Sequence, residues 1–438
     1  MTAEGGEPFA GLLIEGAAAI ATLAGGLRRG SSQGELAIVA GGTAVAAWGD
    51  RLIAVGSAAD VERRIVAGGF PLEAFARLDA AGGLVTPGLI DAHTHLVFAG
   101  TREGEWQMRA RGAGYLAILA AGGGILSTVA ATRAASDADL LAGARARLGE
   151  MLANGTTTAE AKSGYGLNTR TELRQLEVIG RLDREGPVQL VPTYLGAHAV
   201  APEFRGRPDA AEAYVAHVIA EQLPAVVRQE IARFCDVFCE KGVFDPGQTT
   251  RILEAARGFG LTLRVHADEL VASGGAELAA RLGCLSADHL AAPSEVGVAA
   301  LAGAAEAGDP VVATLLPATS WFLGAHHFAP ARRFIDAGIP VALATDLNPG
   351  TSPTVSLPLV MSIACLEMGL TPAEALAAVT INAAYSIGLG AEVGSIEPGK
   401  QADLVVWGLP SVDQIPYWLG GRPVRSVVKR GRLVFGRD

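Results

Sequence analysis

The chain has 438 residues, of which 50% are hydrophobic and 18% are charged, and this composition excludes an intrinsically disordered protein. Its formal net charge of −10 makes nucleic acid a poor expected partner, because phosphate backbones bind basic surfaces. The four cysteines are too few for a disulfide framework, so we expect a reducing, cytoplasmic location.

No uncharged stretch has the character of a membrane span. The longest stretches are 112–132, 310–331 and 347–366, and glycine or proline interrupts each of them. The first residues, MTAEGGEPFAGLLIEG, carry acids where a signal peptide has basic residues. We therefore expect a soluble protein without a membrane partner.

Short apolar runs separated by glycine occupy residues 1 to about 85, a pattern typical of strands joined by tight turns. The expected strands are Leu36–Ala40, Thr43–Trp48 and Leu52–Val55. The expected turns are Gly41–Gly42 and Gly49–Asp50, and the expected flexible loop is Gly30–Gly34.

Helical segments alternate with apolar strands from about residue 86. The clearest pairs are Asp139–Ala153 with Thr156–Ala161, Leu173–Glu185 with Val188–Tyr194, and Gln248–Gly258 with Leu261–Ala267. This alternation indicates parallel βα units, and it repeats often enough for a closed (β/α)8 TIM barrel. The fold class predicted is therefore α/β.

Short strands return near the carboxyl terminus, at Ala402–Trp407 and at Val424–Val434 with a break at Gly431. We expect residues 1–85 and 391–438 to form one small β-sandwich domain, and residues 86–390 to form the barrel. The termini of one domain often lie close together, which favours this interpretation. Two unrelated small β modules are the alternative.

Several of the eight histidines stand where a predicted strand ends. His93 and His95 follow the apolar run 84–91. Residues i and i+2 of a strand face the same side, so this pair can point two imidazoles at one ion. A packing or surface role is the alternative for such a pair.

His266, His289 and Asp346 also end apolar runs. In a β/α barrel the carboxyl ends of the strands converge on one face, so residues distant in sequence meet there. The pair His93 and His95, a third histidine and an aspartate make a site of nitrogen and oxygen ligands for a divalent transition metal. Hydrogen-bonded strand ends, or a helix N-cap at Asp346, are the alternatives.

Such an ion would lower the pKa of a bound water and polarise a carbonyl, so hydrolysis of a C–N bond is the expected reaction class. Proton transfer is expected from Asp346, with His289 and Glu269 free to assist. We expect one metal per chain. The pair His326–His327 has no acid beside it, and Lys162 is expected to be a structural or substrate-side residue instead of a bridging carbamate.

Six further segments resemble the amidohydrolase superfamily, and within it the imidazolonepropionase family. They are Pro87–Arg102, Ala121–Thr128, Lys162–Gly166, Tyr194–Val200, Val265–Glu269 and Thr345–Thr351. The segment Gly394–Leu404 is found across the superfamily and supports only the broader resemblance. Together the similar segments span about residues 35–435.

This resemblance implies the hydrolysis of 4-imidazolone-5-propanoate to N-formimidoyl-L-glutamate, the third step of histidine degradation. It implies a zinc or iron ion on His93, His95, His266 and Asp346. It implies substrate contacts from Arg102, Tyr165, His198, Glu269, Asn348, Gly350 and Thr351. It also makes His289 a catalytic residue and implies a homodimer.

These implied roles are physically reasonable, although each has a plainer alternative. Arg102 can offer a bidentate fork to the propionate, which an acidic protein needs locally, or it can be a surface arginine. Tyr165 stands between two glycines, which lets its phenol approach a ligand, or it is a packed loop residue. His198 is expected to bond substrate, with a fourth metal ligand as the alternative.

Two other functions share part of this pattern. Another mononuclear amidohydrolase, such as a purine or pyrimidine aminohydrolase, would keep the four ligands, Glu269 and His289 but would not need Arg102. A barrel without catalytic activity would be expected to have lost ligands, and all four are present.

Overall fold

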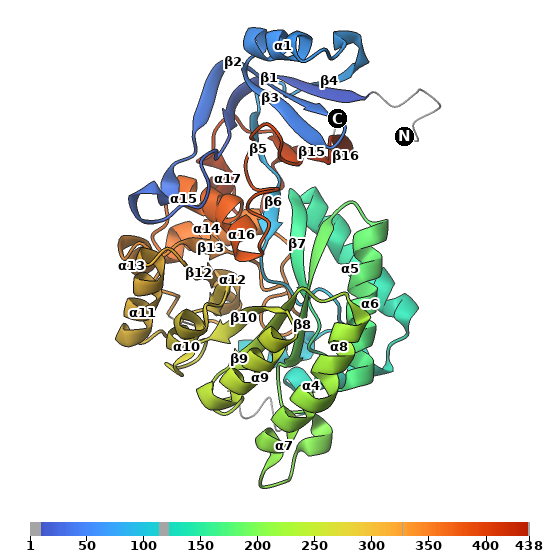
Figure 1. Ribbon diagram of the computed structural model, residues 1–438, viewed down its shortest axis with the longest axis vertical. Coiled ribbons are helices and arrows are strands. Elements are labelled where there is room, and N and C mark those ends of the chain that lie inside the picture. Colours follow the sequence, from blue (N-terminus) through green and yellow to red (C-terminus); the bar gives the residue numbers. More distant parts are fainter. Residues whose placement is uncertain (1–9, 114–121, 326, 437–438) are drawn as a thin grey trace.

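The computed structural model describes residues 10–113, 122–325 and 327–436, and these form two sheets. Figure 1 shows the smaller sheet, with β1 and β16, at one end of the molecule and the barrel below it. Residues 1–9, on which part of the signal-peptide expectation depends, lie outside the described residues, as do Ala121 and His326.

Strands from both ends of the chain build the smaller, mixed sheet, in the order β16-β15-β14-β5-β1-β2-β3 with β4 paired to β1. The strands are β1 Gly11–Ala21, β2 Ile38–Trp48, β3 Arg51–Ser57, β4 Phe75–Asp79, β5 Leu84–Pro87, β14 Leu404–Trp407, β15 Val424–Lys429 and β16 Arg432–Gly436. The prediction of one small β domain made from both termini is confirmed. Its exact limits, near residues 85 and 390, stay a prediction.

Alternation along β1 explains how this sheet buries both faces. Leu12 and Ile14 join an apolar cluster with residues of β5 and β14, whereas Leu13 packs on the other face with Ile65 of α1 (Ala58–Ala67). Helix α1 starts where the Ser57 hydroxyl accepts a hydrogen bond from the backbone of the third helical residue, at 3.2 Å.

Two local predictions in this part are wrong. The pair Gly41–Gly42 is not a turn, because β2 runs through it, and the register of β1 and β2 shifts beside it. Both glycines adopt positive φ, of 82° and 62°, so the pair forms an irregularity within the strand. Gly30–Gly34 is not a flexible loop but a 3-10 helix, η1, whose buried Gln33 donates to the Val341 carbonyl at 2.9 Å.

The larger sheet is an eight-stranded parallel barrel in the order β13-β12-β11-β10-β9-β8-β7-β6. Its strands are β6 Leu89–Asp91, β7 Thr156–Lys162, β8 Gln189–Ala197, β9 Phe234–Cys239, β10 Thr262–Ala267, β11 Ser286–His289, β12 Val312–Leu315 and β13 Val341–Leu343. A parallel bridge between Thr94 and Leu347 joins the segments that follow the first and last strands. The predicted TIM barrel is confirmed.

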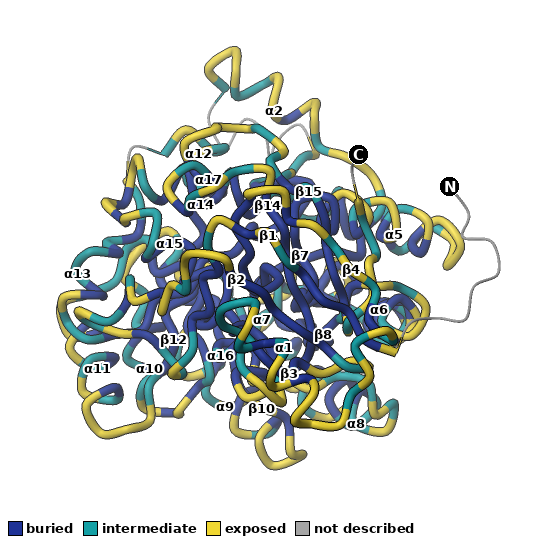
Figure 2. Tube along the Cα trace, turned by 90° about the horizontal axis from the view of Figure 1, so that it is seen from above, coloured by how far each residue is buried: buried dark blue, intermediate teal, exposed yellow. Residues whose placement is uncertain are grey.

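Helices surround these strands, and Figure 2 shows buried strands inside a rim of more exposed segments. The remaining α-helices are α2 Glu103–Ala110, α4 Ile125–Ala134, α5 Asp137–Ala153, α6 Thr169–Glu185, α7 Ala210–His217, α8 Leu223–Gln229, α9 Pro246–Gly258, α10 Gly275–Leu282, α11 Glu295–Glu306, α12 Pro317–Phe322, α13 Ala331–Asp336, α14 Leu357–Glu367, α15 Pro372–Ala378, α16 Ile381–Ser386 and α17 Gln414–Tyr417. The short turns are η2 Leu72–Ala74, η3 Pro202–Phe204 and the π-helical η4 Val218–Gln222. All three predicted helix–strand pairs are present.

The smaller sheet packs against the amino ends of the barrel strands. Lys429 of β15 donates to Asp403 at 2.7 Å, and its Nζ also lies 3.3 Å from Gln189 and 3.4 Å from Thr158, near the starts of β8 and β7. The carboxyl ends of the strands therefore lie at the opposite end of the barrel.

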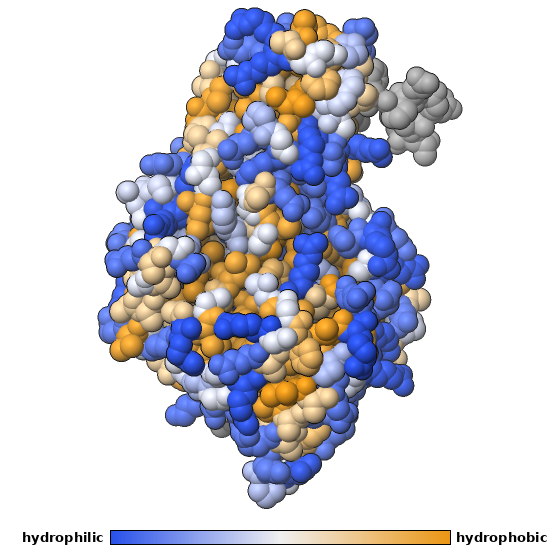
Figure 3. Space-filling model, in the orientation of Figure 1, coloured by the Kyte–Doolittle hydropathy of each residue, from blue (hydrophilic) through white to orange (hydrophobic). Residues whose placement is uncertain are grey.

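The outer surface in Figure 3 carries hydrophilic side chains over both parts of the molecule. Among the helices that the structure describes, none has both the length and the apolar character needed to cross a bilayer.

Candidate metal centre

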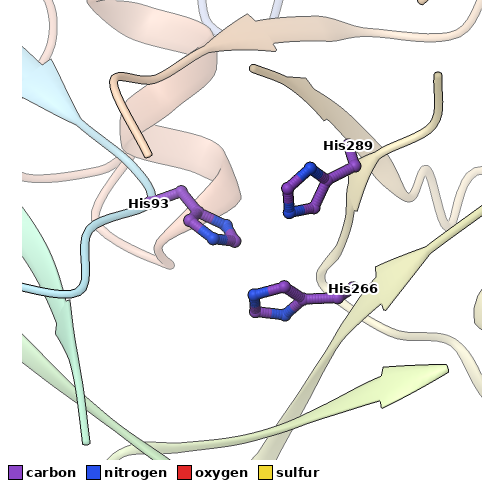
Figure 4. Close-up of side chains that lie close together, drawn as sticks. All are labelled: His93, His266 and His289. Atoms are coloured by element: carbon purple, nitrogen blue, oxygen red, sulfur yellow. The ribbon is translucent and has the colours of Figure 1, made fainter. Parts of the chain in front are cut away.

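Three strand ends bring histidine rings together at the carboxyl end of the barrel. His93 follows β6, His266 belongs to β10 and His289 ends β11. Figure 4 shows the three rings pointing toward one space, with centroids 4.6 to 5.4 Å apart. One ligand atom from each ring lies within 4.8 Å of the others, so the three can share an ion.

His95 and Asp346 complete the predicted ligand set. Asp346 Oδ1 lies 3.5 Å from His93 Nε2 and 3.4 Å from His95 Nε2. The backbone N–H of Asp346 donates to the His93 carbonyl at 3.0 Å, and that of His95 donates to the Leu347 carbonyl at 2.9 Å. Closure of the barrel therefore positions the carboxylate beside the two imidazoles.

Several buried polar atoms at this centre lack hydrogen-bond partners among the described residues. They include His93 Nε2, His266 Nε2 and Asp346 Oδ1. Buried polar atoms without a partner are rare in folded proteins because each costs free energy. Imidazole nitrogen and carboxylate oxygen are donors that a divalent transition metal accepts, so this set fits such an ion.

Two of the imidazoles, those of His93 and His95, are also in the protonation state that metal binding requires. Burial, and after it the positive charge of Lys162, lowers the pKa of His93 well below its ordinary value. Burial and the neighbouring His266 do the same to the pKa of His95. Both rings are neutral at physiological pH and keep a lone pair for a ligand.

Asp346 is held in place by a residue that the sequence analysis missed. The Thr319 hydroxyl, at the start of α12, donates to Asp346 Oδ2 at 2.6 Å and leaves Oδ1 for the histidines. Asp346 and His289 both have positive φ, of 52° and 74°, which costs energy for residues other than glycine. Strain of this kind concentrates at functional sites, and no local sequence pattern marks Thr319.

Glu269 and His289 face each other across 3.6 Å, from Oε2 to Nε2, beside the metal centre. Burial, with the nearby charges of Asp346 and Glu240, raises the pKa of Glu269 to about 8. Burial lowers the pKa of His289 to about 3. At neutral pH Glu269 therefore holds a proton, and His289 is a neutral base.

These two residues line a cavity of about 90 Å³ together with Leu316, Thr319 and His327. Because Thr319 also bonds Asp346, this cavity lies beside the predicted ligands. His326, the neighbour of His327, lies outside the described residues, so the expectation that this pair holds no second metal stays a prediction.

Tyr165 and His198 lie on the β7 and β8 side of the centre. The His198 ring stacks on His95 with centroids 4.8 Å apart, and the Tyr165 ring is 5.7 Å from His95. His198 Nδ1 lies 3.1 Å from the Gly164 carbonyl, which can only accept, so Nδ1 carries the hydrogen and Nε2 keeps a lone pair. His198 also groups with His95 and His266 within ligand distance, so a metal-ligand role stays open.

A buried carboxylate, also missed from the sequence, organises the loop that carries Tyr165. Glu172 of α6 accepts backbone hydrogen bonds from Gly164, Gly166 and Leu167 at 2.9, 2.8 and 2.7 Å. Three such bonds fix the loop and bring Tyr165 to the centre, where its side chain is buried. Glu172 stands three residues after Thr169 in a helical segment, and this position in the sequence gave no sign of its role.

Arg102 is not a free cation in this structure. Its Nε and Nη2 donate to the two carboxylate oxygens of Glu105, both at 2.8 Å, and Glu105 also accepts from the Gly124 N–H at 2.8 Å. The guanidinium lies directly against Gly350, where the Cβ of any other residue would overlap Arg102 Nη1. Glu105 therefore orients the arginine, and Gly350 makes room for it. Arg102 and Glu105 are three residues apart, a spacing at which helical side chains meet, so the sequence could have predicted this ion pair.

The loop after β13 is organised by its own asparagine. Asn348 Nδ2 donates to the Asp346 carbonyl and to the Thr351 hydroxyl, both at 2.8 Å. Its Oδ1 accepts from the N–H groups of Gly350 and Thr351, also at 2.8 Å. The side-chain amide is thus engaged within the loop that presents Asp346, and direct contact of Asn348, Gly350 or Thr351 with substrate stays a prediction.

A parallel barrel that presents imidazoles and a carboxylate at the carboxyl ends of its strands defines a class, the metal-dependent barrel hydrolases. Residues 84–434 match the amidohydrolase family. The imidazolonepropionase of Geobacillus kaustophilus (strain HTA426) is 55% identical over 357 residues, which cover 82% of each chain. That of Alkaliphilus metalliredigens (strain QYMF) is 47% identical over 425 residues, or 97% of each chain.

The chain therefore belongs to the amidohydrolase family and, within it, to the imidazolonepropionases, which are hydrolases. Two solved structures share the fold. An adenosine deaminase from Xanthomonas campestris with bound zinc has a TM-score of 0.66 and 19% identity, covering 97% of this chain and 93% of its own. Escherichia coli guanine deaminase has a TM-score of 0.67 and 16% identity, covering 98% and 100%.

Proposed function

We propose that this enzyme hydrolyses the cyclic amide C–N bond of 4-imidazolone-5-propanoate and releases N-formimidoyl-L-glutamate, the third step of histidine degradation. The identity of 47% to 55% with imidazolonepropionases over most of the chain supports this substrate. The structural observation that carries the chemistry is the set of buried, unpartnered atoms His93 Nε2, His266 Nε2 and Asp346 Oδ1.

His93, His95, His266 and Asp346 would hold one divalent ion, zinc or iron, since their nitrogen and oxygen donors suit both. When bound, such an ion acts as a Lewis acid that acidifies water and polarises a carbonyl. The neutral state of the His93 and His95 imidazoles and the unpaired Oδ1 of Asp346 support this assignment.

Asp346 and His289 are the proposed acceptors of the proton from the attacking water. Asp346 has one oxygen occupied by Thr319, which orients the carboxylate, and His289 is a neutral ring 3.6 Å from Glu269. Water adds to the ring carbonyl carbon, the bond from that carbon to the ring nitrogen breaks, and the nitrogen takes a proton. Glu269, which is protonated at neutral pH, is the proposed donor of this proton.

The propionate of the substrate needs a local cation in a protein of net charge −10. Arg102, oriented by Glu105, is the proposed partner of the propionate. His198 Nε2 would accept from a ring N–H, and Tyr165 would close the other side of the ring. The loop with Asn348, Gly350 and Thr351 would complete the contacts beside Arg102.

The alternative of a purine or pyrimidine aminohydrolase is not favoured. The deaminases that share this fold are only 16% and 19% identical to the chain, far below its identity to the imidazolonepropionases. A barrel without activity is disfavoured because the four expected ligands fall in overlapping groups among the described residues: His93, His95 and Asp346 form one group, and His266 joins His93 or His95 in others.

The direct test is the loss of imidazolone propionate absorbance with the purified chain, with and without a chelator. We expect turnover that the chelator abolishes and that zinc or iron restores. Turnover of guanine or adenosine in place of the imidazolone would support the aminohydrolase, and no turnover of any of them by the metal-loaded chain would contradict a catalytic role. A homodimer and a cytoplasmic location stay part of the proposal, and light scattering tests the former.

A further inference from the structure

Behind the metal centre lies a cluster of five charged side chains that are almost completely buried. Its members are Glu160, Lys162, Asp236, Arg264 and Asp288, which come from β7, β9, β10 and β11. Lys162 Nζ donates to Glu160 at 2.9 Å and to Asp236 Oδ2 at 2.7 Å, and it lies 3.8 Å from Asp288. Lys162 is thus fully engaged in ion pairs, and the cluster is continuous across the barrel.

Each aspartate of this cluster also faces the rear nitrogen of a predicted metal ligand. Asp288 Oδ2 lies 2.7 Å from His93 Nδ1, and Asp236 Oδ2 lies 3.0 Å from His266 Nδ1. Asp288 is anchored by Arg264 Nη2 at 2.9 Å and by the Ser286 hydroxyl at 2.7 Å. Asp236 is anchored by Lys162 and by the backbone N–H of His266 at 3.1 Å.

We propose that Asp236 and Asp288 are positioning residues that fix the tautomer and orientation of His266 and His93 for metal binding. An ionised carboxylate can only accept, so each aspartate keeps the ring hydrogen on Nδ1 and leaves the lone pair on Nε2. The Nε2 atoms of both histidines lack hydrogen-bond partners among the described residues. At the rear of the rings, His93 Nδ1 is hydrogen-bonded to Asp288, whereas His266 Nδ1 lies within ion-pair distance of Asp236 without a well-aligned hydrogen bond. The two carboxylates thereby determine which ring nitrogen faces the predicted metal site.

The charges of the cluster fit this role. Its three carboxylates exceed its two cations by one, and the adjacent Asp346 adds another negative charge. A buried excess of two negative charges is costly unless an opposite charge compensates it. A divalent cation at the histidines supplies that charge, so the cluster favours the metal electrostatically and also orients its ligands.

His95 provides an internal contrast. Its Nδ1 has no hydrogen-bond partner among the described residues, and its only ion pair with a carboxylate there is from Nε2 to Asp346, so no carboxylate stands behind this ring. His95 lies instead between the Asp346 carboxylate and the stacked ring of His198. The carboxylate support is therefore specific to two of the three imidazole ligands and is not a general property of the barrel end.

The experiment measures the zinc affinity of the full chain by competition with a chelating indicator. We expect Asp236→Asn and Asp288→Asn each to weaken zinc binding about 10- to 100-fold, because the neutral amide holds the imidazole less firmly. Asp403→Asn is the matched control, since Asp403 is also a buried aspartate paired with a buried lysine but lies at the other end of the barrel. The control should destabilise the fold and leave zinc affinity unchanged. A folded Asp236→Asn or Asp288→Asn variant with unchanged affinity would overturn the inference.

A second measurement needs no variant, in case the substitutions prevent folding. Nitrogen-15 spectra of the histidine rings in the metal-free wild-type chain report the tautomer of each ring directly. We expect the hydrogen on Nδ1 of both His93 and His266, and a hydrogen on Nε2 of either would overturn the inference. The proposal rests on the metal site of the proposed function. Failure of the wild type to bind zinc would contradict that site, whereas normal zinc binding with the wrong tautomers would contradict only the positioning role.

Discussion

Each end of the barrel contains a buried lysine–aspartate pair, and the two pairs have different surroundings. At the amino end Lys429 contacts Asp403 at 2.7 Å, and at the carboxyl end Lys162 contacts Asp236 at the same distance. Around the first pair the remaining lone pairs are used, since Asp403 also accepts from Gln401 and from the N–H of Arg430. The second pair lies beside His93 and His266, whose Nε2 atoms have no partner among the described residues.

The comparison shows that one kind of ion pair serves two purposes. A buried pair whose atoms are all engaged joins two parts of the fold, and here it joins the smaller sheet to the barrel. A pair whose aspartate lies beside a histidine leaves the far nitrogen of that ring without a partner. This arrangement is unfavourable without a ligand and favourable with one. The predictions below test this division, beginning with the largest expected effect.

Asp346→Asn should cause the largest change at the carboxyl end. The amide is a weaker metal ligand and cannot accept a proton, so we expect kcat to fall by about 10²- to 10⁴-fold. Initial rates on imidazolone propionate, with the zinc content measured in parallel, check this. Asp403→Asn should keep the kcat of the folded protein, and a similar loss of kcat in both variants would contradict the division between the two ends.

Lys429→Met should act on stability at the amino end. It leaves Asp403 buried without its cation, and loss of one partner of a buried pair costs about 3–5 kcal/mol of unfolding free energy. Urea denaturation followed by circular dichroism measures the loss. The folded fraction should retain wild-type kcat and zinc affinity, and reduced zinc affinity would show that the two ends are coupled.

Arg102→Lys should raise KM more than it lowers kcat. Lysine lacks the planar fork for a carboxylate, and a lost charge-assisted hydrogen bond of about 1.5–3 kcal/mol corresponds to about 10- to 150-fold in KM. Gly350→Ala should change KM in the same direction, because its methyl group would displace the guanidinium. Steady-state kinetics decide the point, and a fall in kcat at unchanged KM would mean that Arg102 does not bind the propionate.

Glu374→Gln should give the smallest effect, on an outer helix. Burial alone would raise the pKa of Glu374, but hydrogen bonds from Arg332 and Thr371 outweigh it and hold the pKa below 4.5. Because the folded pKa is depressed, the stabilisation is present above pH 4.5 and is lost as pH falls through the folded value. We expect a loss of about 1 kcal/mol at pH 7 that shrinks below pH 4.5, measured by urea denaturation at each pH. A loss independent of pH would contradict the role of its charge.

Much of the fold could be predicted from local patterns. The helix–strand pairs of the barrel and the pair His93 and His95 were recognisable because their signals repeat within a few residues. The prediction of a turn at Gly41–Gly42 was wrong because it rested on local signals alone. Glycine permits a turn locally, but pairing with β1 makes the strand continue through these residues. Gly30–Gly34 became ordered because Gln33 reaches a barrel strand far along the chain.

The sequence by itself determined the barrel, the predicted ligands and the family resemblance, since each depends on residue types at short spacing. Only the tertiary structure decided that Asp288 stands behind His93, 195 residues away, and that Thr319 fixes Asp346. In the sequence Asp236 and Asp288 are merely acids within short apolar strands. Their partners lie on other strands, and these contacts exist only once closure of the barrel brings the strand ends together.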